Sequence, residues 1–253
     1  MLTLKKRKIK KKMKNNLYLT IGLALALLLP FCASGQDPLI TKENMPNAVH
    51  FLPAPPDTAS AAFAYDKAQY RWGLEQRKDS LRCAIAVTDA EWSVACMCRI
   101  YADALGFTIS KEATPAIYEM LSVGVMTTDQ VGKVPKEHYM RTRPYVFFGE
   151  PTIVPGDEEE LSHNGSYPSG HTILGWSAAL LLTELAPEHA DAILTIGYRY
   201  GQSRVIAGFH WQSDVDAGRL CASAAVARLH ADPRFLKLME AAHEEYNKIC
   251  ERR

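Results

Sequence analysis

The chain carries, at positions 203–214, the stretch SRVIAGFHWQSD. If the residues from His210 onward are helical, Asp214 lies one turn after His210, and its carboxylate can accept the Nδ1 proton of the imidazole. Nε2 is then free to act as a nucleophile. A histidine and an aspartate at this spacing are commonly a surface pair, but Phe209, Trp211 and Val215 surround them here, and an unpaired polar group among such residues is costly. The stretch therefore predicts an oriented histidine in apolar surroundings.

A second polar cluster, GSYPSGHT at 165–172, precedes an apolar helical pattern that starts at about Thr172. Small residues such as Ser169 and Gly170 at a helix start expose backbone N–H groups. Such a terminus binds anions, because its first donors lack intrahelical partners and its dipole favours negative charge. Ordinary helix capping is the alternative explanation of this serine and glycine. His171 directly follows them and adds a titratable group.

A third cluster consists of two cations, Lys136 and Arg143, with Pro144 directly after the arginine. Seven residues make about two helical turns, so both cations can share one helix face, and Pro144 is expected to end any helix there. A solvated pair of charges is the alternative explanation.

The three clusters together supply what phosphoryl transfer requires. Cations and N–H groups can hold the phosphoryl oxygens, a histidine with an orienting carboxylate can attack, and a second histidine can serve as the acid.

The rest of the chain has helical patterns and no convincing run of alternating strand pattern. Apolar residues recur at three- and four-residue spacing near 60–77, 88–107, 110–125, 135–141, 172–186, 188–203, 212–230 and 233–251. The segment 145–168 is expected to be the one long irregular loop. The longest central apolar stretch has only twelve residues, so these are core helices and not membrane spans. The predicted fold is all-α, with an extended proline-containing arm at 36–58 and one helical domain at 59–253.

The N-terminus has the outline of a secretory signal peptide. Eight lysines and arginines precede an uncharged apolar run, 17–29, which is too short for a membrane span of about 20 residues. Small residues at 33–35 predict cleavage after Gly35 and a periplasmic or secreted mature protein that starts at Gln36. An uncleaved anchor and Met13 as the true start are the alternatives, and a lipoprotein is disfavoured because the bulky Phe31 precedes Cys32.

Cleavage changes the charge of the chain. The whole sequence has 29 basic and 28 acidic residues, and the mature chain keeps 21 basic residues, so its net charge falls from +1 to −7. An acidic exported protein lacks the excess of positive charge that binding to nucleic acid requires. Five cysteines remain, at positions 83, 96, 98, 221 and 250, and their spacing indicates buried thiols or one structural bridge rather than a metal site.

The clusters read KxxxxxxRP (136–144), PSGH (168–171) and SRxxxxxHxxxD (203–214), in that order. This pattern resembles the signature of the type 2 phosphatidic acid phosphatase and vanadium haloperoxidase superfamily. Within it, the longer stretches 165–172 and 203–214 resemble the bacterial class A non-specific acid phosphatases, and the similarity covers roughly residues 48–230. The resemblance implies a single-domain helical bundle of the acid phosphatase and vanadium haloperoxidase type.

The resemblance also implies roles for individual residues. His210 attacks phosphorus, Asp214 orients it and His171 protonates the departing alcohol. The phosphoryl oxygens are held by Lys136, Arg143, Ser169, Gly170 and Arg204. Three cations can replace the Mg²⁺ of many phosphoryl-transfer enzymes, so we expect no metal and no cofactor.

The expected activity is the metal-independent hydrolysis of a broad range of phosphomonoesters, such as nucleotides, sugar phosphates and aryl phosphates, through a phosphohistidine. Phosphotransfer to alcohols is an expected side activity, vanadate an expected inhibitor, and a homo-oligomer the expected assembly. A membrane lipid phosphatase would need long apolar spans, a vanadium haloperoxidase is the alternative from another reaction class, and a phosphate-binding protein would need the cations without the His210–Asp214 pair.

Overall fold

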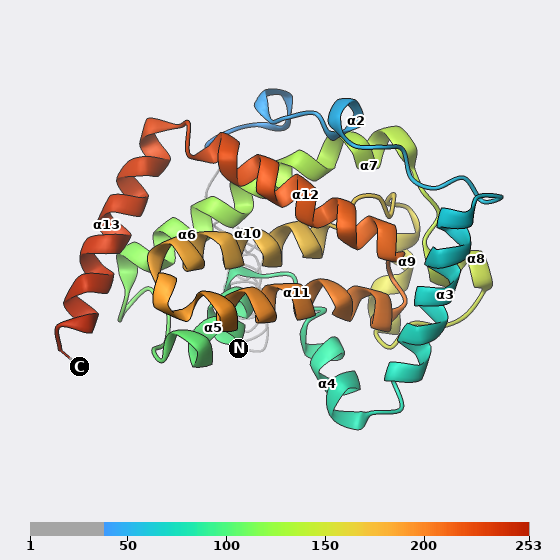
Figure 1. The fold of residues 1–253 in the computed structure, drawn as a ribbon, viewed down its shortest axis with the longest axis horizontal. Coiled ribbons are helices and arrows are strands. Elements are labelled where there is room, and N and C mark those ends of the chain that lie inside the picture. Colours follow the sequence, from blue (N-terminus) through green and yellow to red (C-terminus); the bar gives the residue numbers. More distant parts are fainter. Residues whose placement is uncertain (1–37, 253) are drawn as a thin grey trace, which may run out of the picture. The chain divides into compact units, whose positions relative to one another are not determined.

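The computed structural model describes residues 38–252, and all regular secondary structure within that range is helical (Figure 1). The predicted all-α fold class is therefore confirmed. The predicted signal peptide and its cleavage position lie outside the described residues. Among the described helices, none is both long enough and apolar enough to cross a membrane.

The N-terminal part of the described chain holds two short helical turns followed by the first long helix. Residues 38–60 contain η1 (Lys42–Asn44) and α2 (Ala48–Phe51). The next helix, α3 (Ala61–Gln76), begins after Ser60, whose hydroxyl accepts the N–H of Phe63 at 3.1 Å. A serine at this position satisfies a donor that the first helical turn leaves without a partner.

Most of the remaining chain forms helices, of which α10 makes the most extensive contacts with other elements. These elements are α4 (Ser80–Thr88), α5 (Val94–Leu105), α6 (Pro115–Thr128), η2 (Asp129–Gly132), α7 (Lys133–Tyr139), α8 (Pro144–Phe148), η3 (Pro155–Asp157), α9 (Glu158–Ser162), α10 (Gly170–Leu185), η4 (Pro187–His189), α11 (Ala190–Ala207), α12 (Gln212–Leu229) and α13 (Pro233–Cys250).

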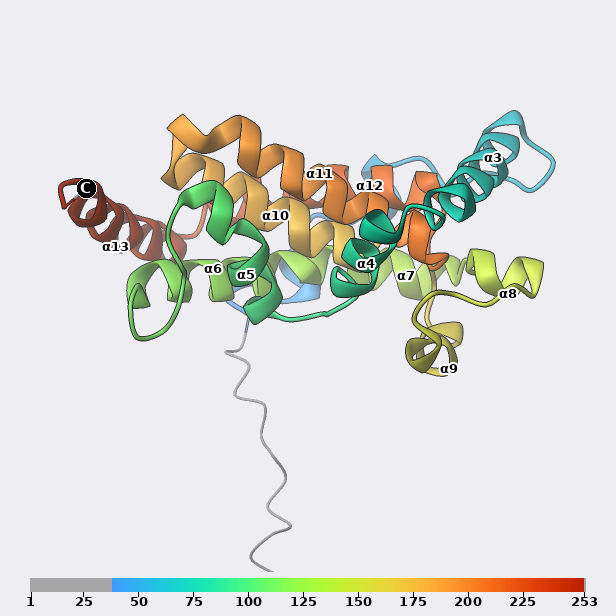
Figure 2. The same cartoon turned by 90° about the horizontal axis from the view of Figure 1, so that it is seen from below.

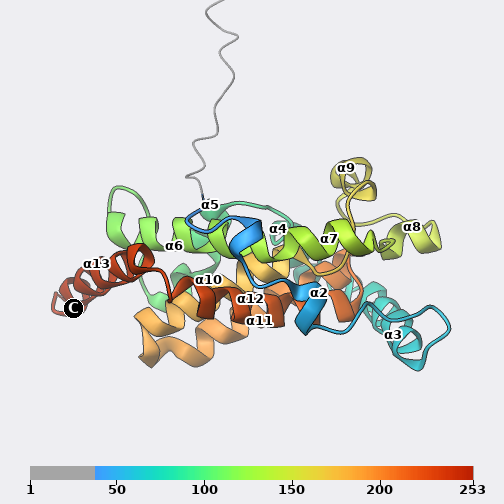
Figure 3. The ribbon, with the colours of Figure 1, turned by 90° about the horizontal axis from the view of Figure 1, so that it is seen from above.

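The central helix α10 is apolar on nearly every face and packs against α6, α11 and α12. Figures 2 and 3 show α6, α7 and α8 following one another in a row beside the other helices, and α13 packs against α6. A helix that is apolar all round is stable only when neighbours cover it, so α10 forms the centre of the core.

Two glycines allow helices to approach the central one closely. A Cβ on Gly175 would lie 2.3 Å from the ring of Tyr200 on α11, and a Cβ on Gly218 would lie 2.9 Å from the carbonyl oxygen of Ser169. Both distances are shorter than any real Cβ contact. Gly218 therefore lets α12 lie directly against the N-terminus of α10, which brings the stretch 203–214 and the cluster at 165–172 together.

Two of the differences between the helical patterns and the structure concern whole elements. The segment expected as one helix over 88–107 begins only at Val94, because α4 ends at Thr88 and Ser93 caps a new helix by accepting the N–H of Cys96. The nine-residue helix α4 was missed. The segment 145–168, expected as an irregular loop, contains α8 and α9.

All five cysteines in the described part of the chain are free thiols, and three of them, Cys96, Cys98 and Cys221, are buried. The interpretation as buried thiols holds for these three, and no structural bridge forms among the five.

Candidate active site

A tight reversal between α11 and α12 places two of the predicted site residues. Gly208 ends α11 with φ +89°, a left-handed conformation that glycine adopts readily. The carbonyl of Arg204 accepts the N–H groups of both Phe209 and His210, at 3.1 and 3.3 Å. This turn holds Arg204 in the last turn of α11 and His210 just before α12, so their side chains face one region.

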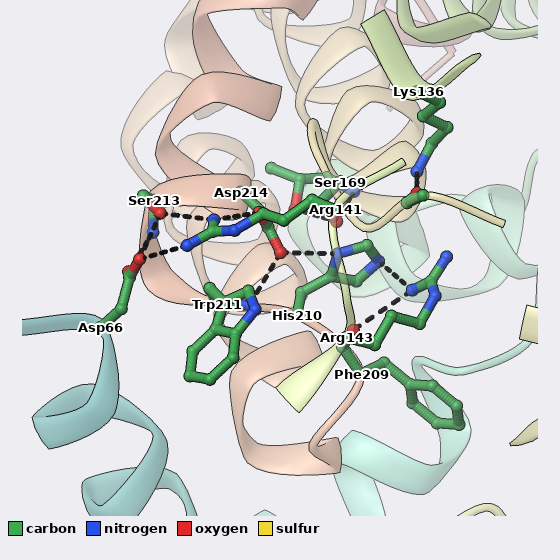
Figure 4. A network of polar contacts seen from close by, with 12 residues as sticks. Asp66, Lys136, Arg141, Arg143, Ser169, Phe209, His210, Trp211, Ser213 and Asp214 are labelled. Atoms are coloured by element: carbon green, nitrogen blue, oxygen red, sulfur yellow. Dashed lines mark hydrogen bonds and ion pairs between the residues drawn. The ribbon is translucent and has the colours of Figure 1, made fainter. Parts of the chain in front are cut away.

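His210 and Asp214 are paired as predicted, but not through a shared helix (Figure 4). The helix α12 begins at Gln212, so the expectation of a helix from His210 onward is wrong. Asp214 instead caps the helix start: its Oδ2 accepts the N–H of Trp211 at 2.8 Å and lies 3.4 Å from Nδ1 of His210. The distance to Nδ1 is at the long end for a hydrogen bond.

The other imidazole nitrogen of His210 contacts a cation. Nη1 of Arg143 lies 3.1 Å from Nε2 and 3.2 Å from the carbonyl oxygen of Phe209. A guanidinium can only donate, so Nε2 accepts and the ring proton is on Nδ1, which faces Asp214. This tautomer leaves the lone pair of His210 on Nε2.

The N-terminus of α10 has the arrangement expected for an anion site. Ser169 is the N-cap: its hydroxyl lies 3.4 Å from the N–H of Thr172, and its carbonyl accepts the N–H of Ile173 at 3.0 Å. The N–H groups of Gly170 and His171 precede these in the first turn, where helix geometry supplies no carbonyl partner. The helix starts two residues earlier than the expected Thr172.

The second histidine is held by the segment between α4 and α5. Nε2 of His171 lies 2.9 Å from the carbonyl oxygen of Ala90, and the ring makes an edge contact with Trp92, with centroids 5.0 Å apart. A carbonyl can only accept, so Nε2 carries a proton. Nδ1 is therefore the nitrogen of His171 that can exchange a proton with a ligand.

Lys136 and Arg143 reach the site from different elements, so the prediction of one shared helix face is wrong. The helix α7 ends at Tyr139, followed by Met140 at φ +40°, and Arg143 precedes α8. Pro144 starts α8 rather than ending a helix, because proline is well tolerated at the first helical position. Nζ of Lys136 donates to the carbonyl of Gly165 at 2.9 Å.

A cavity of about 480 Å³ collects most of the predicted residues. Its lining includes the side chains or backbone of Lys136, Arg143, Gly170, His171 and His210. The site residues that do not line it, Ser169, Arg204 and Asp214, are fully buried behind it. Among the described residues, no group of three or more His, Cys, Asp or Glu side chains could hold a metal ion.

Arg204 is the most unusual of these residues. Its side chain is fully buried, and none of its three guanidinium nitrogens has a hydrogen-bond partner within the described residues, although its charged group lies over the ring of Phe209 at 4.6 Å. A buried unpaired charge is costly, and a fixed fork of donors matches a phosphate group. The arrangement is suited to an anion that supplies the missing acceptors.

Burial and the three cations shift the pKa values of the site. Burial, with the charges of Arg143, Lys136 and Arg204, holds the pKa of His210 well below its usual range, although a hydrogen bond to the main chain of Ser166 acts in the opposite direction. Burial and Arg204 lower the pKa of His171 in the same way. For Lys136, burial and the charge of Arg143 lower the pKa to about 7. Both histidines are therefore neutral when no anion is bound.

Known proteins match this chain over most of its length. A family model described as PAP2 superfamily matches residues 117–235. A non-specific acid phosphatase of Providencia stuartii is 42% identical over 204 residues, which are 80% of this chain and 82% of that protein. The non-specific acid phosphatase of Salmonella typhimurium is 40% identical over 231 residues, 91% of this chain and 92% of the relative. An acid phosphatase of Zymomonas mobilis is 39% identical over 236 residues.

The chain belongs to the PAP2 superfamily. It is an acid phosphatase, a hydrolase of phosphoric monoesters, and its fold is the all-α fold expected from the resemblance. The matched relatives are phosphatases by name, which favours hydrolysis over the alternative of halide oxidation.

Sequence reasoning missed four residues that shape this acid phosphatase site. Ala90 and Trp92 contact His171, and Asp66 and Arg141 connect to Asp214. Ala90 acts through its backbone carbonyl, which no sequence pattern reveals. Arg141 stands two residues before Arg143, but nothing in the sequence distinguishes it from a solvated cation.

Proposed function

We propose that this acid phosphatase hydrolyses a broad range of phosphomonoesters through a phosphohistidine on His210, without a metal ion. The observation that carries the proposal is the fully buried guanidinium of Arg204, which has no hydrogen-bond partner within residues 38–252 and lies beside two neutral histidines. Arg204, Arg143, Lys136 and the first N–H groups of α10 would hold the phosphoryl oxygens and stabilise charge that develops on them.

The first half of the reaction forms a phosphorus–nitrogen bond. Nε2 of His210 attacks phosphorus, the bond from phosphorus to the alcohol oxygen breaks, and His171 gives the departing oxygen a proton from Nδ1. Arg143 leaves Nε2 and donates to a phosphoryl oxygen as the ester binds. Asp214 stabilises the positive charge that the imidazole acquires.

The second half reverses the role of His171. As a base it takes a proton from water, the water oxygen attacks phosphorus, and the phosphorus–nitrogen bond breaks to release phosphate and neutral His210. An alcohol in place of water would give phosphotransfer, which we propose as a side activity.

Vanadate and chelation test the absence of a metal. Vanadate adopts the five-coordinate geometry of the transition state, so we expect it to inhibit in competition with substrate, while EDTA leaves activity intact. Steady-state rates on an aryl phosphate with each reagent measure both effects. Activity that is lost on chelation and restored by Zn²⁺ or Mg²⁺ would contradict the proposal.

The pH profile follows from the shifted pKa values. His210 stays neutral in mild acid because its pKa is well below the usual range, whereas Lys136 loses its charge in the free enzyme above about pH 7. The proton that His171 needs can arrive with the substrate, whose second phosphate pKa is about 6, and a bound anion raises the pKa of the histidine.

We therefore expect a bell-shaped kcat/KM with its maximum on the acid side and a decline above about pH 7, where Lys136 is no longer charged. The apparent pKa values of the acidic and alkaline limbs of this profile describe the coupled site and not single residues. In Lys136→Arg, whose charge persists, the alkaline limb should move to higher pH. A kcat/KM that rises steadily into alkaline solution would be incompatible with this arrangement.

We also propose export, supported by the basic and apolar pattern of the first 35 residues. N-terminal sequencing of protein from the periplasmic or culture fraction should begin at Gln36. A chain that still carries the apolar segment 17–29 and sediments with membranes would indicate the uncleaved anchor instead.

A further inference from the structure

The two carboxylate oxygens of Asp214 contact different partners (Figure 4). Oδ2 faces Nδ1 of His210 and the N–H of Trp211, whereas Oδ1 accepts from Nη1 of Arg141 at 2.5 Å. The carboxylate is fully buried. Rotation of this group would therefore break an ion pair and a backbone hydrogen bond together.

Arg141 also contacts a second buried carboxylate. Its Nη2 donates to Oδ2 of Asp66 at 2.7 Å, and its Nη1 donates to the hydroxyl of Ser213 at 2.8 Å. The Arg141 side chain is only 8% exposed, and the Asp66 side chain is fully buried. The guanidinium plane is thus fixed between two carboxylates, one on α3 and one on α12.

Asp66 is in turn fixed to the start of α12. Its Oδ1 accepts the N–H of Ser213 at 2.8 Å, and its Oδ2 accepts the Ser213 hydroxyl at 2.6 Å. Asp66 therefore holds both Arg141 and the residue that directly precedes Asp214. In the network Asp66–Arg141–Ser213–Asp214, each side chain is held by hydrogen bonds to other members of the network.

Arg141 balances the charges of this network. Asp66 and Asp214 are two buried carboxylates that share one arginine, and two buried like charges are costly without a cation between them. If Asp214 turned away from His210, it could no longer accept the Nδ1 proton, and the imidazole would lose its orientation and tautomer.

We propose that Arg141 and Asp66 are positioning residues for the nucleophile, which keep Oδ2 of Asp214 directed at Nδ1 of His210. The inference rests on the proposed role of His210. Neither residue lines the cavity, and Nη1 and Nη2 of Arg141 already donate to Asp214, Ser213 and Asp66, so we assign neither residue to substrate binding. Their loss should affect the attack on phosphorus and leave the binding of phosphate nearly unchanged.

The test compares Arg141→Gln, Arg141→Lys and Asp66→Asn with Arg71→Gln as a matched control. Arg71 lies on α3 like Asp66 and pairs with Glu150 at 2.8 Å, but its side chain is 53% exposed and has no contact with Asp214. We expect kcat to fall by about 10²-fold in Arg141→Gln, the usual cost of a misplaced reacting group. The inhibition constant of inorganic phosphate should stay within about threefold, and Arg71→Gln should behave as the wild type.

The conservative variant separates a positioning role from a merely structural one. Arg141→Lys keeps the positive charge, but its single ammonium group cannot donate to both carboxylates as the guanidinium does. We therefore expect kcat to recover only in part, while the inhibition constant of inorganic phosphate stays near that of the wild type.

A double-mutant cycle shows whether Arg141 acts through Asp214. In an Asp214→Asn background, measured with nitrophenyl phosphate, the further change Arg141→Gln should cost less than about threefold, since the carboxylate that it positions is already gone. Thermal unfolding of each variant identifies any that do not fold, and Asp66→Asn, which has nearly the same shape, then provides the independent variant for the same cycle.

Full additivity in that cycle, or a wild-type kcat in both Arg141→Gln and Asp66→Asn, would overturn the inference. The proposed function fails separately: turnover that survives in His210→Ala contradicts the nucleophile whatever Arg141 does. An inactive His210→Ala beside a normal Arg141→Gln would contradict only the positioning role.

Discussion

Replacement of His210 by alanine is expected to lower turnover by about 10⁴-fold or more, for every phosphomonoester tested. Nε2 of His210 is the nucleophile of the proposed mechanism, and alanine offers no atom that could take its place. The second histidine of the cavity is fixed by Ala90 and Trp92, and Lys136 donates to the carbonyl of Gly165. Of these three groups, only His210 has a carboxylate within hydrogen-bond distance among residues 38–252.

The measurement is stopped-flow release of nitrophenol from nitrophenyl phosphate, followed by steady-state turnover. His210→Ala should show neither a burst nor turnover, whereas the control His163→Ala should resemble the wild type. The imidazole of His163 follows α9, is 77% exposed and does not line the cavity. A turnover rate of His210→Ala within tenfold of the wild type would exclude His210 as the nucleophile.

Replacement of His171 by alanine is expected to have an effect that depends on the leaving group. An alkoxide needs a proton to depart, whereas a nitrophenolate is a much weaker base. Phosphoenzyme formation from alkyl phosphates should therefore slow by about 10²- to 10⁴-fold, and from nitrophenyl phosphate by much less. The geometry supports this role, because the bond from Nε2 to the Ala90 carbonyl leaves Nδ1 as the nitrogen that can donate.

The same variant should also stall in the second half of the reaction. His171 is the proposed base for the attacking water, so His171→Ala should give a stoichiometric burst of nitrophenol followed by slow turnover. Rapid-mixing kinetics with a series of alkyl and aryl esters measure both steps. An equal loss for alkyl and nitrophenyl esters would assign His171 to binding or to the integrity of the site instead.

The sequence predicted the helical fold well where apolar residues recur over long segments. The patterns at 172–186, 212–230 and 233–251 differ from α10, α12 and α13 by at most two residues at either end. Short helices were harder to predict. The helix α4 depends on capping by Asp79, which accepts two N–H groups, and its nine residues are too few for a strong periodic signal.

The structure brings most of the predicted site residues to one cavity, but the geometry of the candidate site was not predictable. Lys136 and Arg143 were expected on one helix face, and they converge on the cavity only because α7 ends before Met140. The contact between Asp214 and His210 was expected from helical spacing, and it depends instead on the cap that Asp214 forms on Trp211. Sequence spacing indicates which side chains can meet, whereas turns and caps decide how they meet.

Residues that act over long sequence separations could not be found from the sequence. Asp66 precedes Ser213 by 147 positions, and their contact depends on how α3 packs near the start of α12. Arg204 was predicted as a phosphate ligand, but its complete burial without a hydrogen-bond partner becomes visible only in the structure. Burial and hydrogen bonding are properties of the fold. They distinguish a buried cation that lacks acceptors from a cation surrounded by water.

The most direct test of the proposed phosphohistidine mechanism is to trap the phosphorylated enzyme and locate the phosphate. The enzyme is mixed with a phosphorus-labelled aryl phosphate, quenched in alkali within milliseconds, digested and mapped by mass spectrometry, since phosphohistidine survives base and is lost in acid. We predict one labelled site, on His210. The label should be absent in His210→Ala and should accumulate in His171→Ala. Label on a serine or an aspartate, or an acid-stable label in the wild type, would contradict this mechanism.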